Sequence, residues 1–322
     1  MSIRGHVGRC AIVPAELAGA NITQDTARFA ITPECDANYL MWCLRSTETQ
    51  RWMMRHVKGV AVKGINLGDV KQIPVPLPPL AEQRRIAAVL DAAEALRAKR
   101  RAALAKLDSL TQAIFFDMFG DPAEKPQKWP VRELSEVVLK GTIVTYGIVQ
   151  AGDEIPGGVP YIRTGDISNG EILVDELRRT SPEIAAKFDR SKVRTGEIVM
   201  SIRATVGTTA IVPAGIDGAN LTQGTARIAP GADTANLYLL HCLRAPGTQA
   251  WIQRQVKGAT FREITLSRLR QLPIPLPPRS LQERFVEVAM CIEQMRTTFD
   301  SSSTKLESLF ASLQHRAFRS EL

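Results

Sequence analysis

The chain contains a duplicated module, and this repeat constrains the fold more than any other feature of the sequence. The segment that begins at Met1 matches the segment that begins at Met200 without a gap, and roughly half of the aligned positions through residue 79 are identical. The shared stretches include AIVPA at residues 11–15 and 210–214. Residues 1–79 and 200–278 are therefore copies of one structural unit.

Each copy ends at a proline-rich boundary that leads into a long helix. The boundaries are QIPVPLPP at residues 72–79 and QLPIPLPP at residues 271–278, where repeated prolines forbid continued helix and favour extended backbone. The first helix is predicted from about Ala81 to Met118, and the second covers residues 279–322. At ~1.5 Å per residue the first helix is ~55 Å long, which makes it a spacer.

Both helices carry a stripe of residues at alternating steps of three and four, the a/d pattern of a coiled coil. Because the two stripes have equal length and equal register, we expect them to pair within the chain. The alternative is a seam shared with another subunit. The predicted seam residues are Ile86, Val89, Leu96, Leu107, Leu110, Ile114, Phe285, Val288, Ile292, Met295, Leu306, Leu309 and Leu313.

Residues 129–278, after a linker at residues 121–128, are predicted to form a compact α+β domain. Short β-rich runs occur at residues 159–164, 196–202, 208–212 and 225–228, and apolar residues have helical spacing at 237–244 and 248–255.

Residues 1–79 have no counterpart of residues 129–199, so we expect them to be about half of such a domain. Half a domain leaves strand edges and apolar surface uncovered unless a partner completes it. The sequence therefore predicts an amino-terminal truncation, with an internal start codon, a frameshift or a split gene as its origin.

Composition favours a nucleic-acid partner. The 322 residues are 44% apolar and 23% charged, as in ordinary globular proteins, but the net charge is +8. Residues 200–278 carry eight basic and three acidic side chains and residues 1–79 carry nine and six, whereas residues 129–199 carry nine and eleven. The positive surplus therefore lies in the two copies, where Lys and Arg could contact phosphates.

The sequence gives no sign of a membrane segment, a metal site or a disulfide framework. No apolar run approaches the ~18 residues of a membrane helix and no signal-peptide core follows Met1, so a cytoplasmic protein is expected. The five scattered cysteines are predicted to be reduced, mostly buried thiols, and the four isolated histidines suggest no metal or acid–base role.

Several segments together resemble the specificity subunits of Type I restriction-modification systems. They lie at residues 76–86 (PLPPLAEQRRI), 129–137 (WPVRELSEV), 157–167 (GGVPYIRTGDI) and 196–201 (GEIVMS). Each motif alone is weakly specific. The resemblance nevertheless covers nearly the whole chain, and the order of recognition domain, proline hinge and helix, repeated twice, is specific.

The resemblance implies an α+β fold with mixed-sheet target recognition domains and an antiparallel pair of long helices as a spacer. Each recognition domain of such a subunit reads one half of a bipartite DNA site. It also implies methyltransferase and restriction-motor subunits as partners, which carry out adenine methylation and cleavage. A second copy or a separately encoded half-domain is a further candidate partner.

No catalytic motif is found in the chain, so we expect no enzyme activity and no cofactor. A methyltransferase needs a glycine-rich turn and an Asn/Asp-Pro-Pro-aromatic element, and no Pro-Pro here precedes Tyr, Phe or Trp. The phosphate-binding loop of nucleotide-driven motors is also missing.

Candidate DNA contacts in the repeated segments are basic or polar residues near predicted turns. Arg203 and Arg4 either bind guanine or phosphate, or form a structural salt bridge, and the polar run from Asn220 is either a turn scaffold or a set of base contacts. The loop that follows Val256 suits phosphate contact, with solvated surface as the alternative. The candidates are Arg4, Gln24, Lys58, Lys63, Arg203, Asn220, Thr222, Gln223, Lys257, Thr260 and Arg262.

Base readout is expected mainly outside the repeated segments, because two recognition domains usually read different half-sites. In the unshared region the candidates are Thr145, Tyr146, Gln150, Arg163 and Thr164, with packing roles as the alternative. The sequence indicates neither the target nor its spacing.

Two functional hypotheses follow. The first is a DNA-binding specificity subunit that directs Type I methylation and restriction. The second is a truncated interaction protein that binds methyltransferase subunits or self-associates through its helices without reading DNA.

Overall fold

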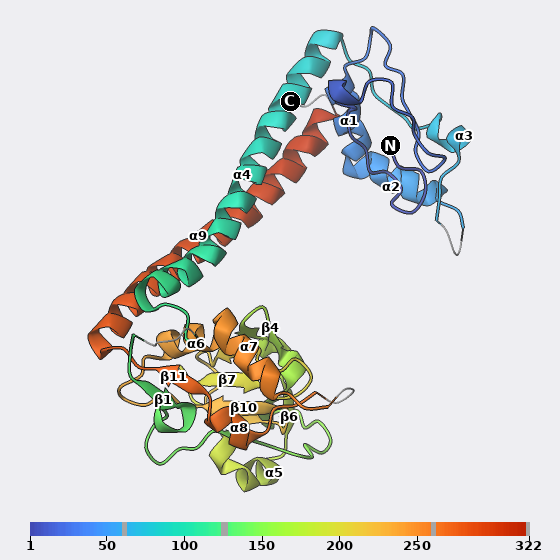
Figure 1. Cartoon of the computed structure of the whole chain (residues 1–322). Helices are drawn as coiled ribbons and strands as arrows, with labels where there is room; N and C mark the ends of the chain where they lie inside the picture. Colours follow the sequence, from blue (N-terminus) through green and yellow to red (C-terminus); the bar gives the residue numbers. More distant parts are fainter. Residues whose placement is uncertain (60–62, 124–127, 259–261, 320–322) are drawn as a thin grey trace. The chain divides into compact units, whose positions relative to one another are not determined.

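The computed structural model describes residues 1–59, 63–123, 128–258 and 262–319, and it divides into two compact units (Figure 1). Unit 1 comprises residues 1–105 and 296–322, and unit 2 comprises residues 106–295. Both boundaries cut the long helices α4 (Leu80–Phe119) and α9 (Arg279–Ala317), so each unit holds one end of each helix. Among the described residues, no helix combines the length and apolarity of a membrane span.

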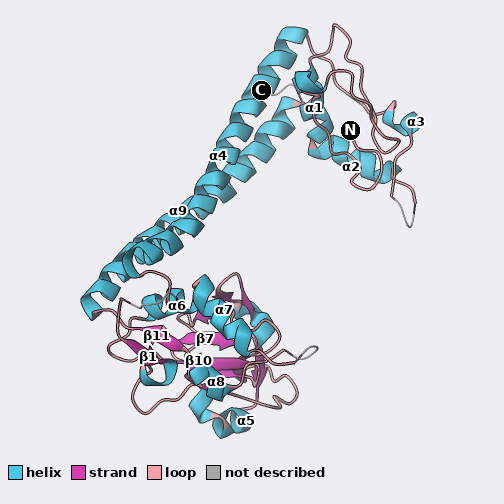
Figure 2. Ribbon diagram, viewed as in Figure 1, coloured by secondary structure: helices cyan, strands magenta, loops and turns pink. Residues whose placement is uncertain are grey.

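In the described part of unit 2, short strands form four small sheets with helices packed against them (Figure 2). One sheet has the order β2-β10-β7-β8 and is antiparallel throughout, and a second has the order β6-β3-β9 with β3 and β9 parallel. Its elements are β1 (Val131–Glu133), β2 (Thr145–Tyr146), β3 (Val159–Ile162), β4 (Ile167–Ser168), β5 (Glu171–Ile172), β6 (Arg178–Thr180), α5 (Pro182–Lys187), β7 (Ile198–Ser201), β8 (Thr209–Ile211), β9 (Asn220–Leu221), β10 (Thr225–Ile228), α6 (Asn236–Arg244), α7 (Pro246–Gln255), α8 (Leu266–Arg270) and β11 (Pro273–Pro275).

The main core of unit 2 joins the sheet to the helix ends. Buried residues of β7 and β10 pack with α6, and Phe115 of α4 and Phe285 of α9 close the same cluster. Both phenylalanines are fully buried and their ring centroids lie 5.5 Å apart. The helix pair is therefore anchored in the domain by aromatic packing.

Unit 1 repeats the helical part of this arrangement without a described strand. It contains α1 (Ala37–Arg45), α2 (Thr47–His56), α3 (Leu67–Val70) and isolated bridges. The bridges Ser2–Thr26 and Lys58–Gly64 fall on the counterparts of Ser201–Thr225 and Lys257–Glu263 in unit 2. Equivalent sequence has therefore produced equivalent backbone pairing.

A buried glutamine shows how closely the two copies agree. Gln282 is fully buried, accepts from the Ala235 amide at 2.8 Å and donates to the Pro277 carbonyl at 2.9 Å. Gln83 makes the same bonds to Asp36 and Pro78, at 2.8 Å each. Each glutamine ties the first turn of its long helix to the segment before α6 or α1, because a buried amide must find partners.

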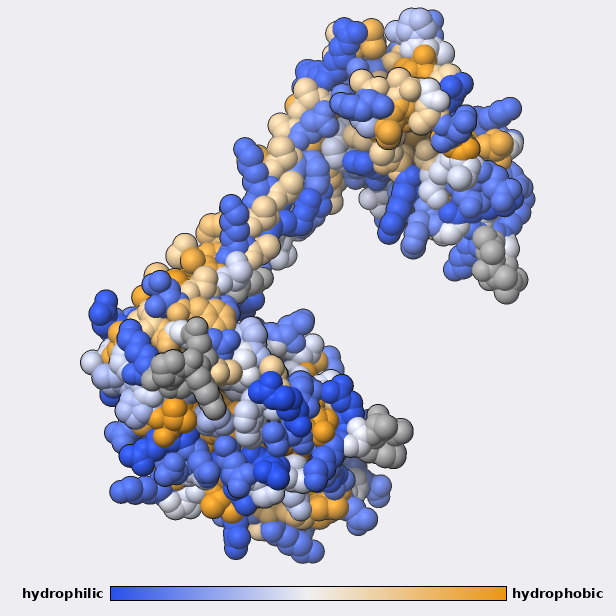
Figure 3. Space-filling view, viewed as in Figure 1, coloured by the Kyte–Doolittle hydropathy of each residue, from blue (hydrophilic) through white to orange (hydrophobic). Residues whose placement is uncertain are grey.

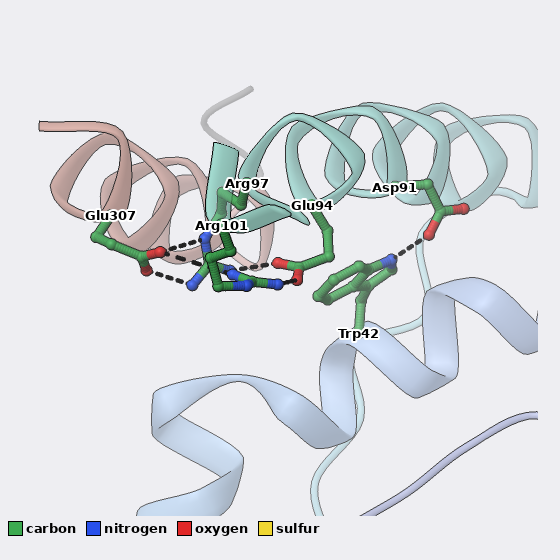
Figure 4. A network of polar contacts seen from close by, with 6 residues as sticks. All are labelled: Trp42, Asp91, Glu94, Arg97, Arg101 and Glu307. Carbon is green, nitrogen blue, oxygen red and sulfur yellow. Dashed lines mark hydrogen bonds and ion pairs between the residues drawn. The ribbon is translucent and has the colours of Figure 1, made fainter. Parts of the chain in front are cut away.

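The helices pair in opposite directions within each unit. In unit 1 the Arg97 guanidinium lies 4.1 Å from the Phe310 ring and Arg100 lies 4.3 Å from the Phe299 ring. In Figure 4, Arg97 reaches both Glu94 on its own helix and Glu307 on α9. The same network holds α1, since Trp42 Nε1 donates to Asp91 at 2.8 Å.

The predicted seam is wrong at every second position. The first residue of each predicted seven-residue repeat is buried or half-buried, and it is buried at Ile86 on α4 and at Phe285 and Ile292 on α9. The positions three residues beyond them face solvent, with 59% exposure at Leu96 and 66% at Leu309. The exposed members of the predicted seam are Val89, Leu96, Leu110, Val288, Met295 and Leu309.

At each of these exposed positions, the residue that follows in the sequence lies in the observed seam instead, and some of these residues are polar. Leu90, Arg97, Ala289 and Phe310 are buried or half-buried, so the step is four residues and then three. Arg97 can occupy a seam position because its aliphatic stem packs on an aromatic ring while its charged end reaches carboxylates. The prediction selected the apolar residues that precede these positions, such as Leu96 before Arg97, and so the predicted register was wrong.

The cysteines are all free, but the expectation that most are buried is wrong. Cys43 and Cys242 are buried in α1 and α6, at equivalent positions of the repeat, whereas Cys291 is exposed. Burial raises the pKa of Cys43 to about 11 and that of Cys242 to about 12, so both thiols stay protonated at neutral pH.

Acidification is expected to destabilise unit 2 through His241. Burial lowers the pKa of His241 to about 4, and its Nδ1 has no hydrogen-bond partner among the residues that the structure describes. The unfolded chain takes up this proton near pH 6.5, so stability present above that pH is lost as the pH falls toward 4. We expect a loss of about 2 kcal/mol relative to His241→Phe, measured by urea unfolding at pH 7 and pH 4.5. Parallel pH profiles for the two proteins would contradict this assignment.

Candidate nucleic-acid interface

Four turns of unit 2 gather where β10 begins, and we call them the loop face. They are residues 163–166, 202–208, 222–224 and the described part of 256–263. The Ile202 amide donates to Gly224 at 2.8 Å, and the Ala204 amide donates to Arg262 at 3.0 Å. Gly224 is needed here, since a Cβ at this position would lie 2.9 Å from Thr164.

Arg203 lies at the centre of the loop face and is held by a carboxylate. Its Nε donates to Glu263 at 2.7 Å, and its side chain is 41% exposed. Within the described residues the guanidinium makes no other hydrogen bond, so its remaining N–H groups can still meet a phosphate or base edge. The structure thus combines the salt bridge and the exposed donor that the sequence left as alternatives.

The equivalent Arg4 in unit 1 is paired in a different way. Its guanidinium lies 3.7 Å from Asp25, while the counterpart of Glu263 is Gly64. Unit 2 has the reverse arrangement, with Gly224 at the counterpart of Asp25. Glu263 is not among the residues predicted from the sequence, and this exchange of glycine and acid between aligned positions is the signal that could have revealed it.

Other basic residues of the repeat are exposed around these turns. Lys257 is exposed, and Arg262 is exposed and donates to Gln253 Oε1 at 2.5 Å. Thr260 lies outside the described residues. In unit 1, Lys58 and Lys63 are exposed, with the Lys58 ammonium 4.0 Å from Asp69, and Gln24 is exposed as well.

The prediction that Asn220 contacts DNA is wrong. Asn220 is fully buried, and its Nδ2 donates to Phe188 O at 3.1 Å and to Ala185 O and Ser191 Oγ at 3.3 Å. Thr222 Oγ1 donates to Ile162 O at 3.4 Å, so it also supports the turn. Gln223 is half-buried, and its side-chain amide forms no hydrogen bond within the described residues. The polar run is mainly a scaffold that presents Gln223.

The candidate residues outside the repeated segments also divide into residues that support a turn and residues that are accessible. Arg163 makes a two-pronged contact with the buried Asp166, at 2.5 and 3.0 Å, which raises the pKa of Arg163 and fixes the turn that contains Thr164. Tyr146 is 43% exposed and Gln150 is exposed. Thr145 is half-buried, and its hydroxyl donates to the Tyr146 carbonyl. Tyr146 and Gln150 are therefore the accessible members of this set.

Replacing Ala204 by glycine is expected to stabilise the chain by about 0.5–1 kcal/mol. Ala204 has φ +56°, a conformation in which an L side chain crowds the backbone, and the equivalent Gly5 has φ +67°. Denaturant unfolding measures the effect, and Ala210→Gly, on a buried strand, provides a control with the opposite sign. A loss of stability in Ala204→Gly would show that the turn carries no strain.

Comparison with known proteins identifies a family for most of the chain. The family described as Type I restriction modification DNA specificity domain matches residues 1–106 and 126–299. The Type I restriction enzyme EcoBI specificity subunit of Escherichia coli is 29% identical over 300 residues, covering 83% of this chain and 62% of that protein. The putative type I restriction enzyme MjaX specificity subunit of Methanocaldococcus jannaschii is 25% identical over 279 residues, covering 80% and 61%. The chain therefore spans about six tenths of the length of these relatives.

The fold is also found in a solved structure. A chain from a study of complex assembly and conformational transition of the type I R-M system aligns with a TM-score of 0.58 at 22% identity, covering 88% of this chain and 71% of that one. At this identity the likeness concerns the fold alone. It supports the predicted combination of α+β domains and long paired helices.

Proposed function

Since the chain belongs to the Type I restriction modification DNA specificity domain family, we propose that it is a sequence-specific DNA-binding subunit. In this role it directs adenine methylation and restriction by partner subunits to a bipartite site. The chain itself binds and carries out no chemistry, and it works in the cytoplasm. The methyltransferase subunits and the restriction-motor subunit supply the catalytic steps.

The loop face is the observation that carries this proposal. It presents Arg203, Lys257 and Arg262 on turns whose backbones are hydrogen-bonded to one another. We assign phosphate contacts to these three residues and base readout to Gln223, Tyr146 and Gln150. Rigid turns suit readout because the donors are already in place when DNA arrives, so little ordering is required.

The repeat supports a two-part site. Arg4, Lys58, Lys63 and Gln24 lie in unit 1 at or near the positions that the loop-face residues occupy in unit 2. We assign to them the positioning of the second half-site, with a further polypeptide segment completing unit 1. Thr145, Thr164 and Thr222 shape the turns of unit 2.

The exposed apolar helix residues favour a second activity, docking of partner subunits. Val89, Leu96 and Leu309 lie on the unit 1 part of the helices, and Val288 and Met295 lie on the unit 2 part, all outside the observed seam. Apolar side chains that recur along one exposed face of a helix, as Val89 and Leu96 do at a spacing of seven residues, suit a binding surface better than single exposed ones. If DNA reading is lost, the chain would still act as an interaction protein through these surfaces.

Methylome sequencing with and without the gene tests the proposal. We expect a bipartite adenine-methylated motif that disappears on deletion and returns with the intact gene. A matched strain that expresses the loop-face variant Arg203→Ala, Lys257→Ala, Arg262→Ala should not restore it. An unchanged methylation pattern in the deletion strain would contradict the proposal, and co-purification with methyltransferase subunits without site-selective DNA binding would favour the interaction protein.

A further inference from the structure

Unit 1 carries an open groove of about 570 Å³. Residues 22–29, α1, α3 and the chain that follows α3 form its walls, with Ile22, Phe29, Leu67 and Val75 among the apolar lining residues. Ile22 and Leu67 are each 55% exposed. Figure 3 shows apolar patches between polar side chains on this unit. Exposed apolar surface of this kind is normally covered in a finished domain.

Unit 2 shows what covers the same surface in the other copy. The counterparts of Ile22 and Phe29 are Leu221 and Ile228, and both are fully buried. Leu134, Val137 and Val144 belong to the same core cluster as Ile228. All three come from the segment that includes β1 and β2, and no segment of residues 1–79 corresponds to it.

The backbone of the groove offers the pairing groups that this segment uses in unit 2. There β10 pairs with β2, β11 pairs with β1, the Leu134 amide donates to Leu272 O at 2.9 Å, and the Leu276 amide donates to Pro130 O at 2.7 Å. The equivalent groups of unit 1 are Ile73 O and Leu77 N, and neither has a hydrogen-bond partner among the described residues. Backbone with free amide and carbonyl groups is a template for an added strand, as it is at the edge of a sheet.

The side chain of Lys71 is also placed to bind a backbone carbonyl of an added segment. Arg270 donates to the Val144 carbonyl at 2.8 and 3.1 Å in unit 2. Its counterpart Lys71 lines the groove, and its side-chain ammonium makes no hydrogen bond among the described residues. Lys71 is therefore positioned to cap the carbonyl of a bound segment.

We propose that the groove of unit 1 binds, by strand addition, a polypeptide segment with the pattern of residues 130–146. That pattern is an edge strand, a buried leucine directly after it, and a second short strand that ends an apolar run. The occupant is not the same segment of a second copy, because Leu134 and Val144 are buried in the core of unit 2 and would have to leave it. The inference rests on the repeat and is independent of DNA binding.

A synthetic peptide of residues 129–149 added to the full chain tests the proposal. Because unit 2 already holds its own copy of this segment, we expect saturable slowing of hydrogen exchange, at least tenfold, at residues 22–29 and 71–77 only. A peptide with Leu134→Asp and Val144→Asp should bind at least tenfold more weakly. Leu67→Glu in the groove should abolish the protection, whereas Leu17→Glu, which is equally exposed but outside the groove, should leave it unchanged.

A graft in the same chain keeps the test decisive if the peptide alone is too short to fold. Residues 129–199 are copied directly before Met1, which reproduces the junction at Met200 without a linker. We expect the same protection and a loss of binding of an apolar dye. Absence of protection in both the peptide and the graft experiments would overturn the proposal. So would concentration-dependent protection of these residues by the chain alone, since it would identify a second copy as the occupant.

Discussion

Phe285→Ala is expected to lower the free energy of unfolding of unit 2 by about 4 kcal/mol. The Phe285 ring is fully buried, with centroids at 5.5 Å from Phe115, 5.6 Å from Phe119 and 5.2 Å from His241. These rings come from α4 and α6, while Phe285 belongs to α9. Removal of the ring leaves a cavity that cannot close without moving three helices, and the contacts between them are lost.

Urea unfolding followed by the signal of unit 2 measures this loss. Met290→Ala is the matched control, since Met290 lies on the same helix with 60% exposure and its truncation should change stability by no more than about 0.5 kcal/mol. A loss below about 1.5 kcal/mol in Phe285→Ala would show that the aromatic cluster does not hold the helix pair to the domain.

The repeat made much of the fold predictable. Because aligned positions share residue types, the pairing Ser2–Thr26 repeats Ser201–Thr225, and Gln83 repeats the bonds of Gln282. Proline boundaries and apolar spacing placed α4 and α6 within one residue of their observed starts. These features depend on local sequence, and the repeat shows the same local pattern in both copies.

The helix register was not predictable from apolarity. The outward residues Val89 and Leu96 are apolar, whereas the inward residue Arg97 is charged, so a count of apolar positions favours the outward stripe. The observed register depends on Phe310, which packs on Arg97 and Trp42 at a sequence distance of more than two hundred residues. Such contacts have no local signature.

The candidate DNA-binding site was predictable only in part for a similar reason. Asn220 and Gln223 lie in the same polar run, and residue type does not tell which one turns inward. Asn220 is buried because three acceptors, on Ala185, Phe188 and Ser191, converge on its amide. The partner of Arg203 is sixty residues away, at Glu263, and only the exchange of acid and glycine between the two copies hinted at it.

Replacing Arg203, Lys257 and Arg262 together by alanine is expected to weaken DNA binding about 100-fold at physiological salt, since each lost phosphate contact costs about 1 kcal/mol. The slope of log affinity against log salt concentration should fall by about 3, because fewer counterions are released. Fluorescence anisotropy of a labelled duplex between 50 and 300 mM salt measures both quantities.

A change in net charge alone must be separated from a change at the loop face. Arg132→Ala, Lys140→Ala and Arg284→Ala remove the same charge from exposed positions of β1, the turn at the far end of β10 and α9. Because only contacts release counterions locally, this control should change affinity less than about threefold. Equal losses in the two triple variants would show that the loop face is not the DNA-binding surface, and the readout residues would then have to be sought elsewhere on unit 2.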